Sequence, residues 1–330
     1  MADLLKLIPK SDWKVFTDNF AYPTNFMGQK LFPAIKTDDL DVSIAQLVEG
    51  GQIPVMAQIH AFDSEARIGD RPAIEIRDYT KLLIKEKLNQ TERIAQFLKY
   101  APDNNVKQFV FDDAANLISR VLTRAEVATM EVLGTGKATY VENNVNLTVN
   151  YGVNPGDFVE TWSDPTADIL GDIETAVAER ASRGYTTERA ITSSKVIGYM
   201  LANNAIKGYW ANKAEPLTKS RLLTWLNDNY GIEFVVNDAV YKTSLAEEKP
   251  HRFYPENKVT FLSSRTALGQ GMFGYTPEEL TLPETSEKNF VTVTQWYTED
   301  PVAVWTKASA LYVPVLKDSN SVSIYTVKTA

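Results

Sequence analysis

The sequence predicts an α+β fold, in which one long helix and a lobe of shorter helices accompany the strands of a sheet. Residues 290–327 form a series of β-branched and aromatic segments with alternating polarity, which is typical of strands. Residues 109–133 repeat apolar side chains at helical spacing, and residues 165–231 contain three shorter helical patterns. With 330 residues, the chain is long enough for two lobes or one elaborated domain.

The C-terminal strands begin with the alternating segment 290–297 (FVTVTQWY). After Asp300-Pro301 come the strand-like segments VAVW and LYVPVL, then a turn cluster at 317–321 and a last alternating strand at 322–327. We therefore expect strand pairing to hold the end of the chain in a sheet.

Residues 1–35 combine polar and turn residues with many aromatic side chains and show no sustained period. The aromatic residues are Trp13, Phe16, Phe20, Tyr22, Phe26 and Phe32. Such a segment cannot form its own core, yet it has too much apolar surface to remain disordered. It either packs as an arm along a neighbouring subunit or wraps over its own domain.

Residues 40–85 predict a long two-stranded β-loop. The outgoing part passes Gly50-Gly51 and the apolar run 53–59, and the return runs from 73 to 84. The charged segment 63–72 (DSEARIGDRP) forms its tip. Because an isolated hairpin of this kind is marginally stable, we expect it to find partners in its own fold or on another chain.

The helix predicted over 109–133 has Asp112 or Asp113 as its N-cap, since a carboxylate there accepts free backbone N–H groups. Gly134 is its expected end. A hairpin follows at 139–151 (TYVENNVNLTVNY).

The second lobe alternates helices with strands. A helix begins at Asp164-Pro165 and ends at Gly184. A second helix carries the apolar residues from Val196 to Ile206, and a third runs from Pro216 to Gly231. Strands are expected at 232–236 and 258–262.

Composition excludes several classes of function. The formal net charge is −8, without a run of Lys or Arg, which argues against sequence-specific nucleic-acid binding. The absence of Cys excludes disulfides and thiolate chemistry and fits folding in a reducing cytoplasm. Neither a signal peptide nor a membrane-spanning segment is predicted.

The sequence offers no set of residues suited to catalysis. His60 and His251 are the only histidines and are far apart. The segment 134–138 (GTGKA) departs from a phosphate-binding loop, because Glu131 replaces the first glycine and Ala138 the Ser/Thr. Asp112 and Asp113 could act as general acid and base, but helix capping explains them more simply. We therefore predict no enzyme activity, no metal site and no cofactor.

Four segments of the second half occur in the order found in one known family. They are residues 162–168 (WSDPTAD), residues 254–262 (YPENKVTFL), a glycine-rich piece at 269–275, and the stretch from Asp300-Pro301 to the end. In these segments the chain resembles the lambda-type phage major capsid proteins, the phage capsid protein E family. The first half is similar in layout, although Arg67, Gly69, Asp70 and Arg71 stand where the family's loop has a strongly basic, glycine-rich tip.

The resemblance implies a Hong Kong 97-type phage capsid fold with an N-terminal arm, an extended β-hairpin loop, a peripheral domain with a long spine helix, and an axial domain. The implied domains are the arm at 1–35, the loop at 36–88, the peripheral domain at 89–164 with its spine helix at 112–133, the axial domain at 165–285, and C-terminal strands at 286–330 that return to the peripheral domain.

The resemblance also implies a major capsid protein of a tailed phage. Its subunits would assemble in the host cytoplasm into pentamers and hexamers of an icosahedral shell that encloses viral DNA. The implied partners are further copies of the chain, a portal protein, a separate scaffolding protein and a decoration protein. The expected inter-subunit contacts are Trp13, Phe16, Phe20, Arg67, Asp70, Arg71 and Arg77, with the loop arginines facing acidic residues of an adjacent subunit.

Two alternatives remain at this point. An encapsulin-like compartment shell shares the expected fold but encloses enzymes. A hydrolase that uses only carboxylates and hydroxyls is the other. The family-like segments favour the viral shell over both.

Overall fold

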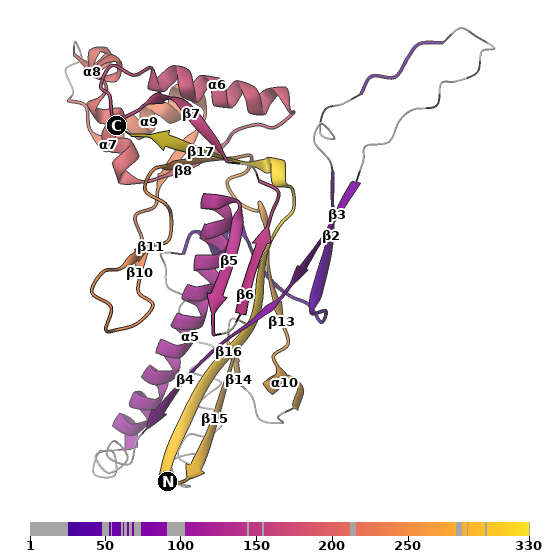
Figure 1. Ribbon diagram of the computed structural model, residues 1–330, viewed down its shortest axis with the longest axis vertical. Coiled ribbons are helices and arrows are strands. Elements are labelled where there is room, and N and C mark those ends of the chain that lie inside the picture. The colour runs from indigo at the N-terminus through magenta and orange to yellow at the C-terminus, as the bar shows by residue number, and fades with distance from the viewer. Residues whose placement is uncertain are drawn as a thin grey trace. The chain divides into compact units, whose positions relative to one another are not determined.

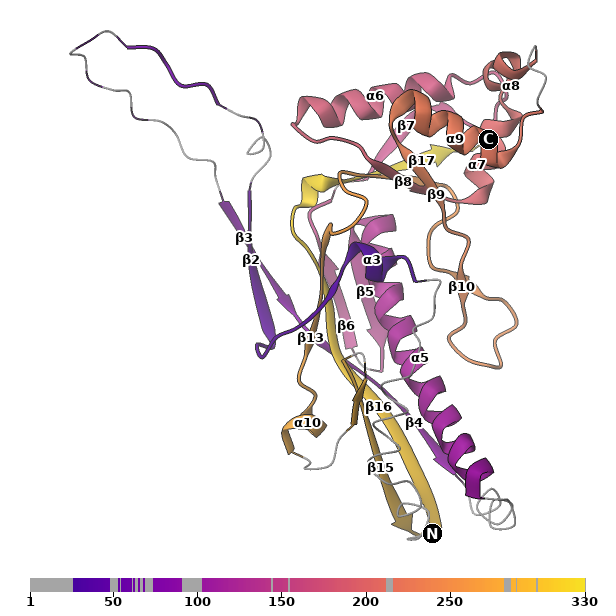
Figure 2. The same cartoon turned by 180° about the vertical axis from the view of Figure 1, so that it is seen from behind.

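The computed structural model describes residues 26–47, 53, 55–60, 62, 65, 68, 74–90, 103–143, 145–153, 155–211, 216–281, 286–288, 290–300 and 302–329 (Figures 1 and 2). Segments that are far apart in sequence gather into two compact units. The first unit consists of Met1–Val42, Tyr79–Ala128 and Gln270–Val315, and the second of Ser43–Asp78, Thr129–Gly269 and Leu316–Ala330. Helices and strands occur in both units, as predicted for an α+β fold.

The first unit is built on a six-stranded sheet with the order β1-β13-β16-β15-β14, in which β4 also pairs with β16. Its strands are β1 (Ala34–Lys36), β4 (Leu82–Gln90), β13 (Gly269–Gly274), β14 (Ser286–Lys288), β15 (Val291–Glu299) and β16 (Val302–Leu316). The long strand β16 pairs antiparallel with β15 over residues 302–309 and with β4 over residues 304–312. β16 is therefore the central strand of this sheet.

Helix α5 (Asp103–Thr135) begins in the first unit, where it packs on one face of the sheet. Its Arg120 pairs with Glu86 of β4, with 2.5 Å between Nη1 and Oε1. Glu86 lies directly opposite the fully buried Ala308 of β16. Because residues opposite one another in an antiparallel pair share a face, α5 covers the face to which Ala308 belongs.

A short helix, α3 (Gly28–Leu31), is anchored to α5 by a buried carboxylate. The Gly28 amide donates to Oε1 of Glu126 at 2.7 Å, and the Glu126 side chain is only 3% exposed. Phe32, directly after α3, is also buried. Burial raises the pKa of Glu126 to about 7, although hydrogen bonds from the backbone of Met27, Gly28 and Gln29 lower it. The carboxyl group therefore titrates close to neutral pH.

The second unit contains a five-stranded sheet in the order β7-β17-β12-β8-β9. Its strands are β7 (Gly156–Thr161), β8 (Arg189–Thr192), β9 (Glu233–Val236), β12 (Lys258–Leu262) and β17 (Val322–Lys328). Its helices are α6 (Ile169–Ser182), α7 (Ser194–Ala202), α8 (Asn204–Trp210) and α9 (Lys219–Tyr230). β12 runs antiparallel to β8 and β17, whereas β8–β9 and β17–β7 are parallel pairs.

The core of the second unit lies between this sheet and its helices. Phe158 of β7 stacks on Trp162 with 4.5 Å between the ring centroids, and Phe261 of β12 packs edge-on against Phe158. The Trp162 indole is 1% exposed and donates to Oδ2 of Asp172 on α6 at 2.8 Å. Aromatic packing with a satisfied indole thus joins α6 to the sheet.

Three two-stranded hairpins and two short helices complete the described elements. They are β2 (Asp41–Leu47) with β3 (Ile74–Thr80), β5 (Lys137–Glu142) with β6 (Val145–Asn150), β10 (Val240–Tyr241) with β11 (His251–Arg252), α10 (Pro277–Thr281) and η1 (Ser319–Ser321). The hairpin predicted at 139–151 and the strands predicted at 232–236 and 258–262 are confirmed.

Several helix boundaries differ from the predictions. α5 begins at Asp103, so Asp112 and Asp113 lie inside the helix and are not its N-cap. It continues through Gly134 to Thr135, and Gly136 with φ +74° follows as the left-handed residue after its end. In α6 the N-cap is Asp168, which accepts the Gly171 amide.

The single helix predicted around 196–206 is two helices. Asn203 has extended backbone, with φ −64° and ψ 135°, and its side chain caps α8 by accepting the amides of Ala205 and Ile206. The capping amide side chain thus competes with continuation of α7. The third helix begins later than expected, at Lys219, where Thr218 is the N-cap.

Two predicted strand patterns are also corrected. VAVW and LYVPVL belong to one strand, β16, because the small and polar residues between them are paired on both sides. The return segment 79–84 is divided, since β3 ends at Thr80 and β4 begins at Leu82 and joins a different sheet. The apolar run at 53–59 forms no strand at its described residues.

Arg180 of α6 connects four parts of the second unit from a buried position, with 1% of its surface exposed. Burial lowers its pKa to about 10. Its hydrogen bonds within the described part of the chain all go to hydroxyl and carbonyl oxygens. These acceptors are Thr187 Oγ1 at 2.9 Å, Ser323 Oγ at 2.6 Å, Ser263 Oγ at 2.6 Å, Ser321 O at 3.1 Å and Thr186 O at 3.3 Å.

Replacement of Arg180 by Met should lower the free energy of unfolding by about 3 kcal/mol, because it leaves several buried oxygens without a donor. Urea unfolding of the purified protein measures this change. Arg183→Met, an exposed position at the end of the same helix, is the control and should change stability by less than about 0.5 kcal/mol. Equal effects of the two substitutions would contradict the role given to Arg180.

Because of Glu126, the free energy of unfolding should fall as the pH rises from 4.5 through 7. Its pKa is raised on folding, so in this range the folded state binds more protons than the unfolded state, and ionisation costs stability. Glu126→Gln removes this term. The difference in unfolding free energy between the variant and the unmodified protein should therefore shift by up to about 3 kcal/mol in favour of the variant between pH 5 and pH 8. A difference that does not depend on pH would contradict this prediction.

Candidate functional site

Between β2 and β3, several of the described apolar side chains are almost fully exposed. Five described large apolar side chains here are 88–102% exposed, namely Val55, Met56, Ile59, Phe62 and Ile68, whereas Ile53 is 44% exposed. Scattered apolar residues are normal on a protein surface, but so many fully exposed residues close together in sequence are typical of a binding surface. We call these five residues the apolar loop residues.

Most of the residues predicted as inter-subunit contacts lie outside the described residues. They are Trp13, Phe16, Phe20, Arg67, Asp70 and Arg71. The described one, Arg77 of β3, donates to Glu75 Oε2 at 3.0 Å. Its guanidinium group also lies against Gly152, where a Cβ atom would come within 2.0 Å of Nη1. Arg77 is thus held by its own chain, and its contact with another subunit stays a prediction.

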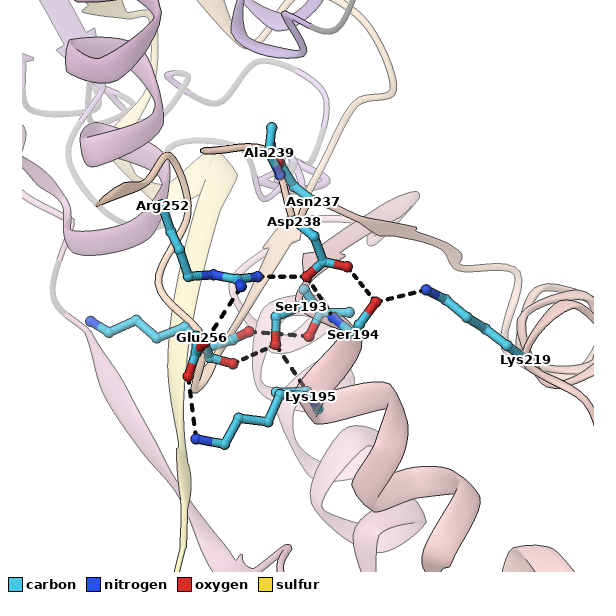
Figure 3. Close-up of polar contacts among 12 residues, drawn as sticks. Ser193, Ser194, Lys195, Lys219, Asn237, Asp238, Ala239, Arg252 and Glu256 are labelled. Atoms are coloured by element: carbon cyan, nitrogen blue, oxygen red, sulfur yellow. Dashed lines mark hydrogen bonds and ion pairs between the residues drawn. The ribbon is translucent and has the colours of Figure 1, made fainter. Parts of the chain in front are cut away.

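A polar cluster in the second unit has residue types that could suggest chemistry (Figure 3). Lys219 Nζ lies 2.8 Å from Ser194 Oγ, and the Ser194 hydroxyl in turn contacts Oδ2 of Asp238. Ser194 is the first residue of α7, and Asp238 follows β9. The cluster therefore joins the start of a helix to the end of a neighbouring strand.

Ion pairs extend this cluster towards β11 and β12. Arg252 Nη2 lies 2.5 Å from Asp238 Oδ1, and its Nη1 lies 3.4 Å from Glu256 Oε1. Lys195 Nζ reaches the other carboxylate oxygen of Glu256 at 3.3 Å. Figure 3 shows the Arg252 guanidinium between the two carboxylates. Since these side chains are 30–46% exposed, each pair contributes little to stability.

The hydrogen bonds of Asp238 suit a structural clasp better than a catalytic group. Burial would raise the pKa of Asp238, but hydrogen bonds from Ser194 and Arg252 outweigh it, so the pKa is lower than usual. A carboxylate with a lowered pKa is a weak base and does not activate a hydroxyl nucleophile at neutral pH. Asp238 Oδ1 also accepts the Ser194 amide at 3.0 Å, which satisfies a free N–H at the start of α7.

Adjacent backbone contacts strengthen the clasp. Ser193 is the N-cap of α7, accepting the Val196 amide while its hydroxyl donates to the Glu256 carbonyl at 2.5 Å. Asn237 Oδ1 accepts the Ala239 amide at 3.0 Å, which turns the chain after β9. The cluster thus fixes the loops at one end of strands β8, β9 and β12.

In the part of the chain that the structure describes, no three His, Asp or Glu side chains gather closely enough to hold a metal ion. Among the described helices, none combines the length and apolar composition needed to cross a bilayer.

Two buried ionisable residues that hold extended segments were missed in the sequence. Glu126 follows Leu122 by four residues and therefore lies on the apolar stripe of the predicted helix, a signal that was available. Lys81, which is 2% exposed, lies inside what looked like one return strand, and nothing local in the sequence marks it as buried.

Solved structures with similar folds include several phage capsid proteins. A putative capsid protein of a prophage of E. coli CFT073 is 11% identical with a TM-score of 0.61, covering 100% of this chain and 98% of its own. A phage-related protein from Bordetella bronchiseptica RB50 is 14% identical with a TM-score of 0.59, covering 96% of both chains. The capsid protein of cyanophage A-1(L) is 12% identical with a TM-score of 0.57, covering 95% of both chains.

These similarities show a phage capsid fold of the Hong Kong 97 type, as the resemblance implied. No curated protein sequence shows a significant match to the chain. The family model described as phage major capsid protein E matches residues 16–327, which is nearly the whole chain. The chain therefore belongs to the phage major capsid protein E family, whose members are structural components of the virion and associate with copies of themselves.

Proposed function

We propose that this major capsid protein assembles into pentamers and hexamers of an icosahedral shell that encloses the DNA of a tailed phage. The exposed surface of the apolar loop residues is the observation that carries this proposal. Phe62 and Ile59 are 102% and 100% exposed, so the described part of their own chain gives them no apolar cover. A neighbouring copy of the chain would supply that cover.

The energetics of burial support this role for the loop. Burying one large apolar side chain contributes about 1.5–3 kcal/mol, so the apolar loop residues together could drive a substantial contact. In a closed shell each subunit makes several such contacts at high effective concentration, and weak contacts therefore combine into a stable assembly. The encapsulin-like alternative has no observation of its own here, and the family match favours a phage shell.

We further propose the partners that such a shell requires. They are a portal protein, a separate scaffolding protein and a decoration protein, and the shell would assemble in the host cytoplasm. Family membership supports this set of partners. Copurification of the chain with the products of neighbouring phage genes tests it.

Negative-stain electron microscopy and light scattering of the purified protein test the shell itself. Closed shells, tubes, or free pentamers and hexamers are the expected products, either alone or after addition of scaffolding protein. A monomer that persists with scaffolding protein present would overturn the proposal.

Charged substitutions at two apolar loop residues should block assembly without unfolding the subunit. Ile59→Asp and Phe62→Asp each remove an apolar contact worth about 1.5–3 kcal/mol, so the yield of shells should fall about tenfold or more. The circular dichroism spectrum and urea midpoint should stay unchanged, because both side chains are fully exposed. Leu245→Asp, at a residue that is 87% exposed in the β10–β11 connection, is the matched control and should assemble normally. Normal assembly of both loop variants would contradict the loop contact.

Charge reversal at Arg67 and Arg71 tests the proposed ionic contacts of the loop. Arg67→Glu with Arg71→Glu should slow assembly at low salt, and the difference should shrink as salt rises, because exposed charges are then screened. Lys242→Glu with Lys249→Glu changes the charge equally at two exposed positions outside the loop and serves as the control. Assembly rates of the double variant that match the control at every salt concentration would count against these contacts.

A further inference from the structure

Lys81 stands where the chain leaves the β2–β3 hairpin and enters β4. Only 2% of the surface of Lys81 is exposed, which is rare for a lysine. The ammonium group contacts three oxygens of the turn that precedes β2: Thr37 O at 2.9 Å, Thr37 Oγ1 at 2.6 Å and Asp39 O. Lysine has three N–H donors, so every donor of this buried group is used.

Backbone hydrogen bonds close the same place. The Lys81 amide donates to Leu40 O at 3.0 Å, and the Thr37 amide donates to Phe273 O of β13 at 2.9 Å. One residue further out, Thr80 Oγ1 donates to Asp41 Oδ1 at 2.6 Å. The residues that enter the hairpin and those that leave it are thus held together at its base.

The aliphatic stem of Lys81 is also enclosed. A Cβ atom placed on Gly274 of β13 would lie 3.0 Å from Lys81 Cδ, so this glycine makes room for the stem. Burial lowers the pKa of the ammonium group, whereas the charges of Asp39 and Asp38 raise it. A buried lysine in this position costs stability unless its hydrogen bonds are made, which explains why the turn must keep its conformation.

The loop beyond this base is long. Holding the two ends of a long segment together costs chain entropy, and that cost grows with the length of the segment. A two-stranded hairpin on its own is only marginally stable in water. The contacts of Lys81 lie where they oppose separation of the two ends.

We propose that Lys81 is the positioning residue of the extended loop: its ammonium group closes the base of the β2–β3 hairpin and so prepares the apolar loop residues for contact with another copy of the chain. This inference rests on the proposed assembly function. In this proposal Lys81 does not itself contact another subunit. It acts through its hydrogen bonds to Thr37 and Asp39.

Lys81→Met tests the inference, since Met preserves most of the apolar stem but has no donors. Hydrogen exchange of the unassembled protein is measured first. The amides of residues 37 and 81 should exchange about tenfold faster in the variant, whereas amides in the β15–β16 pairing should exchange as before. Lys85→Met is the matched control, because Lys85 is an exposed lysine on β4. The control should change neither set of amides.

Assembly is then measured on the same proteins by light scattering and electron microscopy. Lys81→Met should give about tenfold fewer shells, with Lys85→Met close to the unmodified protein. Lys81→Arg should fail to restore assembly, because a planar guanidinium cannot aim three donors at these oxygens.

Each contrary result overturns a specific step. Unchanged exchange at residues 37 and 81 would show that Lys81 does not close the base. Faster exchange throughout β15 and β16 would show a general structural role instead. Local loosening with normal assembly would overturn the positioning role. If the unmodified protein never assembles, the proposed function fails, and the exchange data still decide whether Lys81 closes the hairpin.

Discussion

Three buried ionisable side chains hold together segments of the chain that are far apart in sequence. Glu126, Lys81 and Arg180 are 3%, 2% and 1% exposed, and they form hydrogen bonds with backbone groups and hydroxyls. A buried ionisable group costs several kcal/mol unless its hydrogen bonds are made, so the group and the segment it holds must be ordered together. Glu126 holds α3 after the N-terminal residues, Lys81 holds the base of the extended loop, and Arg180 holds the approach to the last strand.

The exposed cluster around Asp238 makes a useful contrast with these anchors. Its ion pairs bridge loops of the second unit, but the side chains are partly solvated, and screening weakens each pair. The main contribution of the cluster to stability comes from hydrogen bonds at the start of α7. The Ser194 amide and the Ser193 cap satisfy backbone N–H groups there. The same residue types, Ser, Lys and Asp, would suggest a nucleophile in a cleft. Here the lowered pKa of Asp238 and the direction of its hydrogen bonds assign them to helix capping.

Local patterns in the sequence predicted those elements whose stability depends on local periodicity. The alternation of β5 and β6, the strands β9 and β12, and the existence of α5 follow from such patterns. Features set by distant contacts were not predictable. α5 extends back to Asp103, although Asp112 looked like a good cap, and Asn203 divides two helices because its side chain caps the second. Of the candidate contact surface, the extended loop and its apolar run could be foreseen from the sequence, whereas the contact of the loop with a partner remains a proposal. The anchor Lys81 could not, because its acceptors lie in a turn some forty residues earlier.

Anchoring at the base changes where the entropic cost of assembly falls. A loop that is free at its base must be ordered when subunits meet, and that ordering weakens each contact. When Lys81 closes the base during folding, part of this cost has already been met by interactions within the subunit. Each contact between subunits can then remain weak enough to correct errors and still add up over a closed shell. Without its hydrogen bonds, the buried Lys81 would destabilise its own subunit. The subunit therefore folds with the base of the loop closed, and a closed base is what allows a long apolar loop to serve as a contact surface.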